Sequence, residues 1–397
     1  MTATDNALKK GDTNFLLKIV RNQLFIPLVA LLLLVIFNLA TDPGFFKIAL
    51  EPNSDGNMVL SGNLITMIDY ASELVILAIG MTLVTSASGG QDISVGATIA
   101  IAGSTVLRIV KTQSPNISGA KFAGIIVVSF LLCVIVSALF GAFNGALVAF
   151  FKIQPMVATL ILFTAGRSIA AWINNNDNIS ITDKRFSYFG NFIPGIAVPT
   201  PVFITVLCLI VIAIVLKVTN LRLYAQSVGI NASSSRLNGI NPKLIKLLTF
   251  IILGVCVAVC GFIKVSRTSS ITYSVIANNI EMDAILAVAL GGNNLGGGKF
   301  NLSASVVGAY VIQFLTTTLY KFKEIDSSSI SAYKAVVVIL LIIISSPFVR
   351  RWIDDMKNKR EAAKKGSDEL VAVEAAIDEA LENVESVTGS ETGKESV

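Results

Sequence analysis

Repeated apolar runs of membrane-spanning length constrain this chain more than any other feature of its sequence. A helix needs about 20 apolar residues to cross the hydrocarbon core of a bilayer, and runs such as Ala123–Phe151 and Leu244–Ile263 reach that length. Only 14% of the 397 residues are charged, against roughly 25% in globular domains. The sequence therefore predicts an all-α polytopic membrane protein.

About ten segments are expected to cross the membrane, and glycine-rich breaks are expected at two places. One break, SASGGQDISVGA, separates the second and third segments, and the other, GGNNLGGG, follows a short eighth segment. A half-length apolar segment that ends in glycines is typical of a discontinuous or re-entrant helix. The segments are Leu24–Ala40, Ile65–Ser88, Ile93–Val110, Ala123–Phe151, Gln154–Ile173, Val202–Val218, Leu244–Ile263, Asp283–Leu290 with its flanks, Leu302–Tyr320 and Ala332–Val349.

The two breaks share a sequence pattern. Gly89–Gly96 (GGQDISVG) and Gly291–Gly298 (GGNNLGGG) both fit G-G-x-[DN]-[IL]-x-x-G. Six predicted spans separate them, so both breaks should lie on the same side of the membrane. A membrane helix can be interrupted only where protein or water satisfies the freed backbone groups. We therefore expect both breaks to face a protein-lined interior.

Clusters of basic residues indicate which parts of the chain face the cytoplasm. Lys and Arg gather before the first span, between the sixth and seventh, and after the tenth, and such clusters favour the cytoplasmic side. This predicts a cytoplasmic N-terminal segment (1–23), a transmembrane domain (24–349) with a cytoplasmic loop at about 219–243, and a cytoplasmic tail (350–397). The loop at 174–201, rich in Asn and Pro, would then form an exposed outer cap.

The predicted tail is basic at first and then acidic. Residues 361–397 hold ten acidic and three basic residues, so residues 1–360 carry a net charge of +12 against +5 for the whole chain. Leu370, Val373, Ile377, Leu381 and Val384 recur at a spacing of three or four, which predicts a short amphipathic helix. A solvated tail and a tail that docks on a partner both fit this pattern.

Several classes of activity are not expected. The chain has no histidine, its four cysteines lie in apolar runs, and neither glycine cluster ends in the Lys-Ser/Thr of a phosphate-binding loop. We expect no metal site, no bound cofactor, no catalytic residue, no ATP hydrolysis by the chain itself and no nucleic-acid partner; its surroundings are the lipid bilayer.

Polar residues inside the predicted spans are the candidate functional groups, because each is costly in lipid. They suit a hydroxylated, uncharged solute, while an internal hydrogen bond or ion pair that fixes helix packing is the alternative for each. That alternative is favoured more strongly for Asp69 and Glu73. Four further acids are too scattered for a carboxylate pair: Asp177, Asp183, Glu281 and Asp283. The candidate path residues are Gln91, Asp92, Ser94, Asn144, Gln154, Thr159, Arg167, Asn293 and Asn294.

The cytoplasmic loop YAQSVGINASSSRLNGINPKLIKL is expected to contain a short helix. Asn231 is placed to cap its start, and Gly239 is placed to end it. The small residues between them would allow close approach to a groove on a partner. An unpartnered surface helix between spans is the alternative.

Four segments together resemble one family, the permease subunits of ribose-type bacterial ABC sugar importers. They are AIGMTLVTSASGGQDISVGATIAIAG, GAFNGALVAFFKIQPMVATLILFTAGRSIA, SVGINASSSRLNGI and EMDAILAVALGGNNLGGGKFNLSASVVGA, in the family's order. The stretches KIQPMVATLILFTAGR and GGKFNLSASVVGAYVIQ are most similar to the galactofuranose-transporting branch. Gln91 departs from the family, which usually has an apolar residue there, so substrate preference does not carry over directly.

The resemblance implies a fold of about ten helices, a bacterial plasma (inner) membrane location with both termini cytoplasmic, and several partners. These are a second permease (the same chain or a related one), an ATPase subunit with two nucleotide-binding halves that binds the ATP, and an extracytoplasmic sugar-binding protein. It also implies that the cytoplasmic loop contains the helix that docks on the ATPase. The matching residues are Asn231, Ala232, Ser234, Arg236, Gly239 and Ile240.

Three functional hypotheses follow. The first is an ABC importer permease that forms the path for a monosaccharide of the galactofuranose or ribose kind. The second is a self-sufficient secondary transporter of a small polar solute, although such carriers more often show several buried carboxylates. The third, an intramembrane enzyme, is opposed by the missing histidines and nucleophile motifs.

Overall fold

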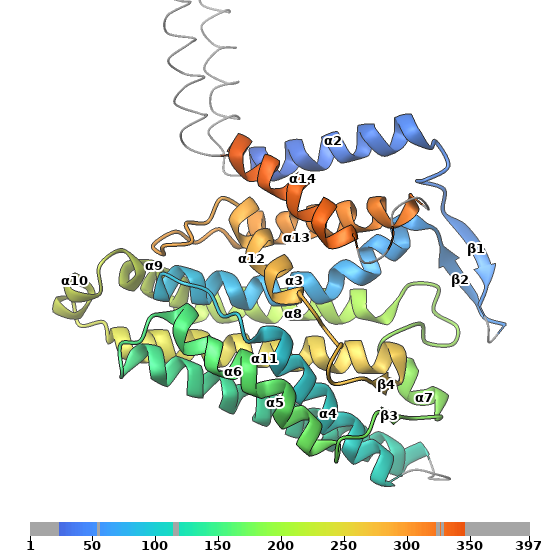
Figure 1. Ribbon diagram of the computed structural model, residues 1–397, viewed down its shortest axis with the longest axis horizontal. Helices are drawn as coiled ribbons and strands as arrows, with labels where there is room; N and C mark the ends of the chain where they lie inside the picture. Colours follow the sequence, from blue (N-terminus) through green and yellow to red (C-terminus); the bar gives the residue numbers. More distant parts are fainter. Residues whose placement is uncertain (1–23, 54–55, 114–118, 323–325, 327–328, 346–397) are drawn as a thin grey trace, which may run out of the picture. The chain divides into compact units, whose positions relative to one another are not determined.

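The computed structural model describes residues 24–53, 56–113, 119–322, 326 and 329–345 (Figure 1). The chain divides into two units, 1–341 and 342–397, and only the last residues of one helix are described in the second unit. The predicted segment 1–23 and the tail 350–397, including its amphipathic helix, lie outside the described residues. The fold below is that of the first unit.

Helices long and apolar enough to cross a membrane dominate the described residues, and seven meet that criterion. Three shorter helices, α2 (Phe25–Thr41), α12 (Ile280–Leu290) and α14 (Ile330–Ser345), match the remaining predicted segments. The prediction of an all-α polytopic membrane protein is confirmed. The seven are α3 (Asn63–Ser88), α4 (Val95–Gln113), α5 (Gly119–Ala149), α6 (Pro155–Ile173), α8 (Thr200–Val218), α11 (Pro242–Thr268) and α13 (Leu302–Lys321).

Local sequence signals set where these helices begin and end. Pro155 and Pro242 occupy the first positions of α6 and α11, where the missing N–H costs nothing. The Asn241 side chain accepts hydrogen bonds from the N–H groups of Lys243 and Leu244 at 3.1 and 3.4 Å and caps α11. Gly89 ends α3 with a φ of 67°, in the left-handed region that favours glycine. The breaks in the apolar runs are therefore encoded locally.

Helices α5 and α11 cross so closely that their backbones touch. A Cβ on Gly141 would overlap the carbonyl oxygen of Phe250, and one on Gly254 would overlap that of Ser137. Small residues at such crossings are how membrane helices gain packing contacts in a solvent as apolar as their side chains. The glycines of α5 and α11 therefore hold the centre of the fold.

Charged side chains join α3 to α11 at the other end of the two helices from α9 and α10. Arg267 donates to Asp69 at 3.0 Å and lies 3.4 Å from Glu73, while Lys264 bonds Glu73 at 2.6 Å. The Glu73 side chain is 3% exposed. Because each buried charge has an opposite charge beside it, the pairs are tolerated inside the domain.

The same end carries two small strand pairs and the predicted outer cap (Figure 1). Strands β1 (Ala49–Pro52) and β2 (Met58–Ser61) pair antiparallel, and β3 (Ile179–Ser180) pairs with β4 (Ser270–Ile271). The short helix α7 (Lys184–Ser187) follows, and hydrogen bonds from the Arg185 side chain lower the pKa of its capping residue Asp183. The loop at 174–201 is less exposed than predicted, since Phe186 is fully buried against α11.

Replacing Gly141 with Val should separate α5 from α11, because the new side chain must displace the Phe250 carbonyl. Overpacking of this kind costs about 1–3 kcal/mol. The measurement is the melting temperature of the purified protein in detergent. Gly124→Val is the matched control, since a Cβ on Gly124 of the same helix meets nothing within 4 Å. Equal melting temperatures for the two variants would contradict this packing.

Candidate functional site

The first glycine-rich break is held by a buried cluster around Asp92. Its Oδ1 accepts hydrogen bonds from the N–H and the hydroxyl of Ser94 at 2.8 and 2.6 Å. The Asn144 side chain, from α5, donates to Asp92 Oδ2 at 3.2 Å and to Ser94 Oγ at 2.9 Å. Asp92 is 4% exposed and Asn144 is 1% exposed. Three of the predicted path residues thus form one buried polar network, in which the Asn144 Oδ1 has no hydrogen-bond partner among the described residues.

Two more predicted residues tie this break to its neighbours. Thr159 on α6 accepts a hydrogen bond from the Ile93 N–H at 3.2 Å. Gln91 donates from Nε2 to the carbonyl of Leu295 at 2.9 Å, and Leu295 belongs to the second break. The side chain that departs from the family pattern therefore links the two breaks.

The second break is organised by Asn293. Its Nδ2 donates to the carbonyls of Val288 and Asn301 and to the hydroxyl of Ser305, while its Oδ1 accepts from the Asn301 N–H at 2.7 Å. Ser305 in turn accepts from Thr82 of α3 at 2.8 Å. Asn294 is exposed and accepts from the Gly296 N–H at 3.1 Å in the turn itself. The amide of Asn293 replaces the hydrogen bonds that the interrupted helix loses.

The two breaks lie directly against each other. The Gly298 N–H donates to the Ser86 carbonyl at 3.0 Å, and a Cβ on Gly89 would lie 2.8 Å from the Gly296 carbonyl oxygen. Gly229, near the end of helix α9 (Leu221–Ile230), reaches the same place, since a Cβ there would overlap the Ser86 carbonyl. Three glycine-containing segments far apart in the sequence meet backbone to backbone.

Two predicted path residues lie elsewhere. Gln154 is exposed and precedes α6. Arg167 lies about 18 Å along α6 from its first residue, and its Nη1 donates to the carbonyls of Tyr273, Ser274 and Ile276, each at 3.1 Å. These carbonyls belong to the irregular segment before α12, which needs such donors if it lies at membrane depth. Arg167 therefore supports backbone in this structure.

The loop after α9 contains the short helix expected from its sequence. Helix α10 (Ala232–Leu237) starts at Asn231, whose Oδ1 accepts from the Ser234 N–H at 3.0 Å. Gly239 follows it with a φ of 80° and allows the turn toward Ile240 and α11. Ser234 and Arg236 are exposed, and Leu237 is 90% exposed. The helix presents small, basic and apolar side chains outward.

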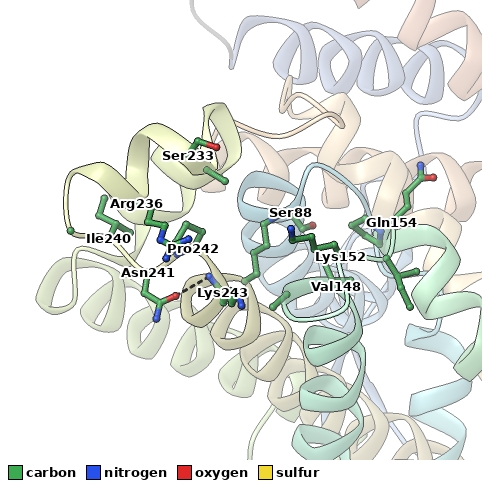
Figure 2. Close-up of a pocket in the computed structure, with 16 residues that line it drawn as sticks. Ser88, Val148, Lys152, Gln154, Ser233, Arg236, Ile240, Asn241, Pro242 and Lys243 are labelled. Carbon is green, nitrogen blue, oxygen red and sulfur yellow. Dashed lines mark hydrogen bonds between the residues drawn. The ribbon is translucent and has the colours of Figure 1, made fainter.

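A pocket of about 760 Å³ opens beside α10 (Figure 2). Its lining includes Arg236, Lys152, Lys243 and Lys246, and none of the described residues that line it is acidic. Gln154 lines it as well, from the start of α6. Lys243 and Lys246 belong to the basic cluster between the sixth and seventh predicted spans, which indicated only the orientation of the chain. Lys152 was not among the predicted site residues. The basic clusters that mark the cytoplasmic side were the available signal for this pocket.

These features define a class of protein: a polytopic helical membrane protein whose two glycine-rich breaks meet near an exposed connecting helix. Comparison with known sequences identifies its family. The model of the branched-chain amino acid transport system / permease component family matches residues 63–346. The chain belongs to this family of transport permeases.

Several curated relatives are similar over most of their length. The galactofuranose transporter permease protein YtfT of Escherichia coli is 38% identical over 341 residues, which cover 85% of this chain and 93% of that protein. The fructose import permease protein FruF of Bifidobacterium longum is 33% identical over 357 residues (89% and 96%). The ribose import permease protein RbsC of E. coli is 31% identical over 323 residues (80% and 92%). No solved structure matches the chain. The resemblance to sugar importer permeases is thereby confirmed.

Replacing Asp92 with Asn should destabilise the domain. The new amide brings N–H donors to a position where Ser94 and Asn144 already donate, and an unsatisfied buried polar group costs about 1–3 kcal/mol. We expect a lower melting temperature and poorer recovery of the purified protein. Asp177→Asn, on the exposed loop, is the control. A stable, well-assembled Asp92→Asn variant that transports poorly would instead indicate a solvated carboxylate on the transport path.

Proposed function

We propose that this chain is the permease subunit of an ABC importer and forms the membrane path for a monosaccharide of the galactofuranose, ribose or fructose kind. Family membership and the three sugar permeases similar over at least 80% of the chain support this proposal. They favour it over a self-sufficient secondary transporter. The chain is a transport component, and we propose that the ATP is bound by a separate subunit.

The proposal of an ATPase partner rests on the exposed helix α10 and the basic pocket beside it. Ser233 and Ser234 allow close approach, while Arg236 and Lys152 lie where acidic side chains of an ATPase subunit would bind. Complementary charges of this kind set register and partner choice at an interface. We assign Asn231, Gly239 and Ile240 the role of holding α10 in position.

The glycine contacts provide a route from this surface to the interior. α9 leads directly into α10, and Gly229 of α9 touches the Ser86 carbonyl and Gly298 of the two breaks. There is no side chain at Gly229 to absorb a displacement, so a shift of α9 must move both breaks. Coupling requires a contiguous physical connection with two arrangements, and this backbone contact supplies the connection.

The proposal also covers the orientation of the chain in the membrane and its other partners. α10 faces the cytoplasm, both termini lie there, and the chain resides in the bacterial plasma membrane. The two strand pairs and the loop at 174–201 then face outward, where an extracytoplasmic sugar-binding protein would dock. A second permease, identical or related, completes the path, and no cofactor is needed in the membrane domain.

Uptake by this protein should require all components. In proteoliposomes that contain the permease, its ATPase and its binding protein, radiolabelled galactofuranose, ribose and fructose are the probes, and ATP-dependent accumulation of at least one is expected. The permease alone should accumulate none, because we propose that ATP hydrolysis by the partner supplies the energy. Uphill uptake by the purified chain without an ATPase would overturn the proposal in favour of a secondary transporter.

Charge reversal on α10 should uncouple the importer. Arg236→Glu should reduce the ATP hydrolysis stimulated by sugar-loaded binding protein about tenfold, which corresponds to about 1.4 kcal/mol of interface energy, and Ser234→Trp should block close approach. Both variants should remain folded, since the two side chains are exposed. Lys111→Glu, exposed at the end of α4, is the control. Normal stimulation and normal complex recovery on a sizing column in both variants would show that α10 is not the docking element.

A further inference from the structure

A second cavity lies between α3, α11, α12 and α13, away from the glycine breaks. Its volume is about 230 Å³, and its polar lining comes from Tyr70, Glu73, Lys264, Asn278, Asp283 and Gln313. Glu73 lies 15 residues before Ser88 on α3, or about 22 Å along the helix. The cavity therefore belongs to the end of the domain that carries the strand pairs, opposite α10.

The charges in and behind its wall compensate one another. Glu73 is bonded to Lys264 at 2.6 Å, and Asp283 accepts from Lys334 of α14 at 2.7 Å. Arg267 holds Asp69 and approaches Glu73. Three acidic and three basic side chains thus form one balanced set among the described residues. An ion entering here would meet no uncompensated charge, so the wall favours a neutral solute.

The polar groups of the cavity that are not held in ion pairs are uncharged, and these can contact a solute. The described chain gives the Gln313 side chain one hydrogen bond, to the Thr317 hydroxyl of its own helix at 3.5 Å, and Asn278 is exposed. An amide both donates and accepts, which is what a sugar hydroxyl requires. Tyr70 is 45% exposed, and its aromatic ring also contacts the Arg267 guanidinium at 4.0 Å. The ring adds an apolar surface suited to the C–H face of a sugar.

The size of the cavity limits what it admits. Pockets for drug-sized ligands measure about 300–1,000 Å³, and this one is smaller. Two structural features keep it open. Arg167 holds the irregular segment at its rim through three carbonyls, and the ion pairs fix the side chains of α3, α11 and α12. A single-ring solute fits such a cavity better than an oligosaccharide.

We propose that this cavity is a transit site in which a monosaccharide binds after its release from the binding protein and before it passes the glycine breaks. The proposal rests on the proposed function and deepens it, because it places the sugar contacts on Tyr70, Asn278 and Gln313. Asp92 and its neighbours then hold the breaks together, and the sugar contact on α3, Tyr70, lies 18 residues before Ser88, or about 27 Å along the helix.

The test measures sugar molecules imported per ATP hydrolysed in the reconstituted importer. Gln313→Leu and Tyr70→Leu should each lower this ratio about fivefold, equivalent to about 1 kcal/mol, or one neutral hydrogen bond. ATP hydrolysis stimulated by loaded binding protein should stay within about twofold of wild type, because docking is unchanged. Tyr320→Leu is the matched control, since Tyr320 is 62% exposed on α13 and does not line the cavity.

Thiol labelling tests occupancy directly. Asn278→Cys is placed in a Cys208→Ser background, because the other three cysteines are buried. A membrane-impermeant thiol reagent added from the outer side should label it, and free ribose or fructose, without binding protein, should slow the reaction. Asp177→Cys, on the exposed loop at the same end, should react at a rate that sugar leaves unchanged.

The outcomes separate this inference from the function on which it rests. A wild-type importer that moves no sugar would overturn the proposed function. A working wild type, with normal coupling ratios in both leucine variants or labelling of Asn278→Cys that ignores sugar, would overturn only the transit site. Loss of stimulated ATP hydrolysis in both leucine variants would also overturn it, because the side chains would then act on assembly.

Discussion

The rest of this structure depends on satisfying the backbone groups that two glycine-rich breaks between helices expose inside a membrane domain. No water is available in lipid to replace those hydrogen bonds. The chain meets the requirement by bringing the breaks together. The Gly298 N–H bonds the Ser86 carbonyl, the Gln91 side chain bonds the Leu295 carbonyl, and Asn293 satisfies the turn after α12. Neither break could be placed alone without leaving polar groups unpaired.

This arrangement separates two kinds of polar residue that look alike in the sequence. Asp92 and Asn144 are buried and bond each other and Ser94, so Asp92 fixes the backbone of the first break through the Ser94 N–H. Gln313 and Asn278 line a cavity and retain hydrogen-bonding capacity. A further group, around α10, is basic and exposed. The domain therefore has an exposed basic surface around α10 at one end and a second cavity toward the other, and the glycine contact lies close to the basic surface.

Much of the fold was predictable because its signals are local. Apolar length indicated the spans, Asn231 and Gly239 bounded α10, and the glycine clusters marked both breaks. Which polar residues bond backbone and which line a cavity was not predictable. Glu73 was expected to form an internal ion pair, and it does so with Lys264 and Arg267. Asp283 was judged too scattered for a carboxylate pair, yet it lines the same cavity as Glu73. Arg167 was expected on the path, and its partners are carbonyls more than 100 residues away.

The sequence by itself determined that this is a membrane protein, that it is helical, where its two breaks lie and which family it belongs to. These features depend on hydropathy, glycine and proline, whose effects extend over only a few helical turns. Only the tertiary structure decided which polar side chain satisfies backbone and which faces a cavity. That choice depends on hydrogen bonds between distant segments such as Gln91 to Leu295 and Lys264 to Glu73, whose partners are 204 and 191 residues apart. These pairs form because glycine-lined helices pack together, and residue spacing along the chain does not predict which helices pack.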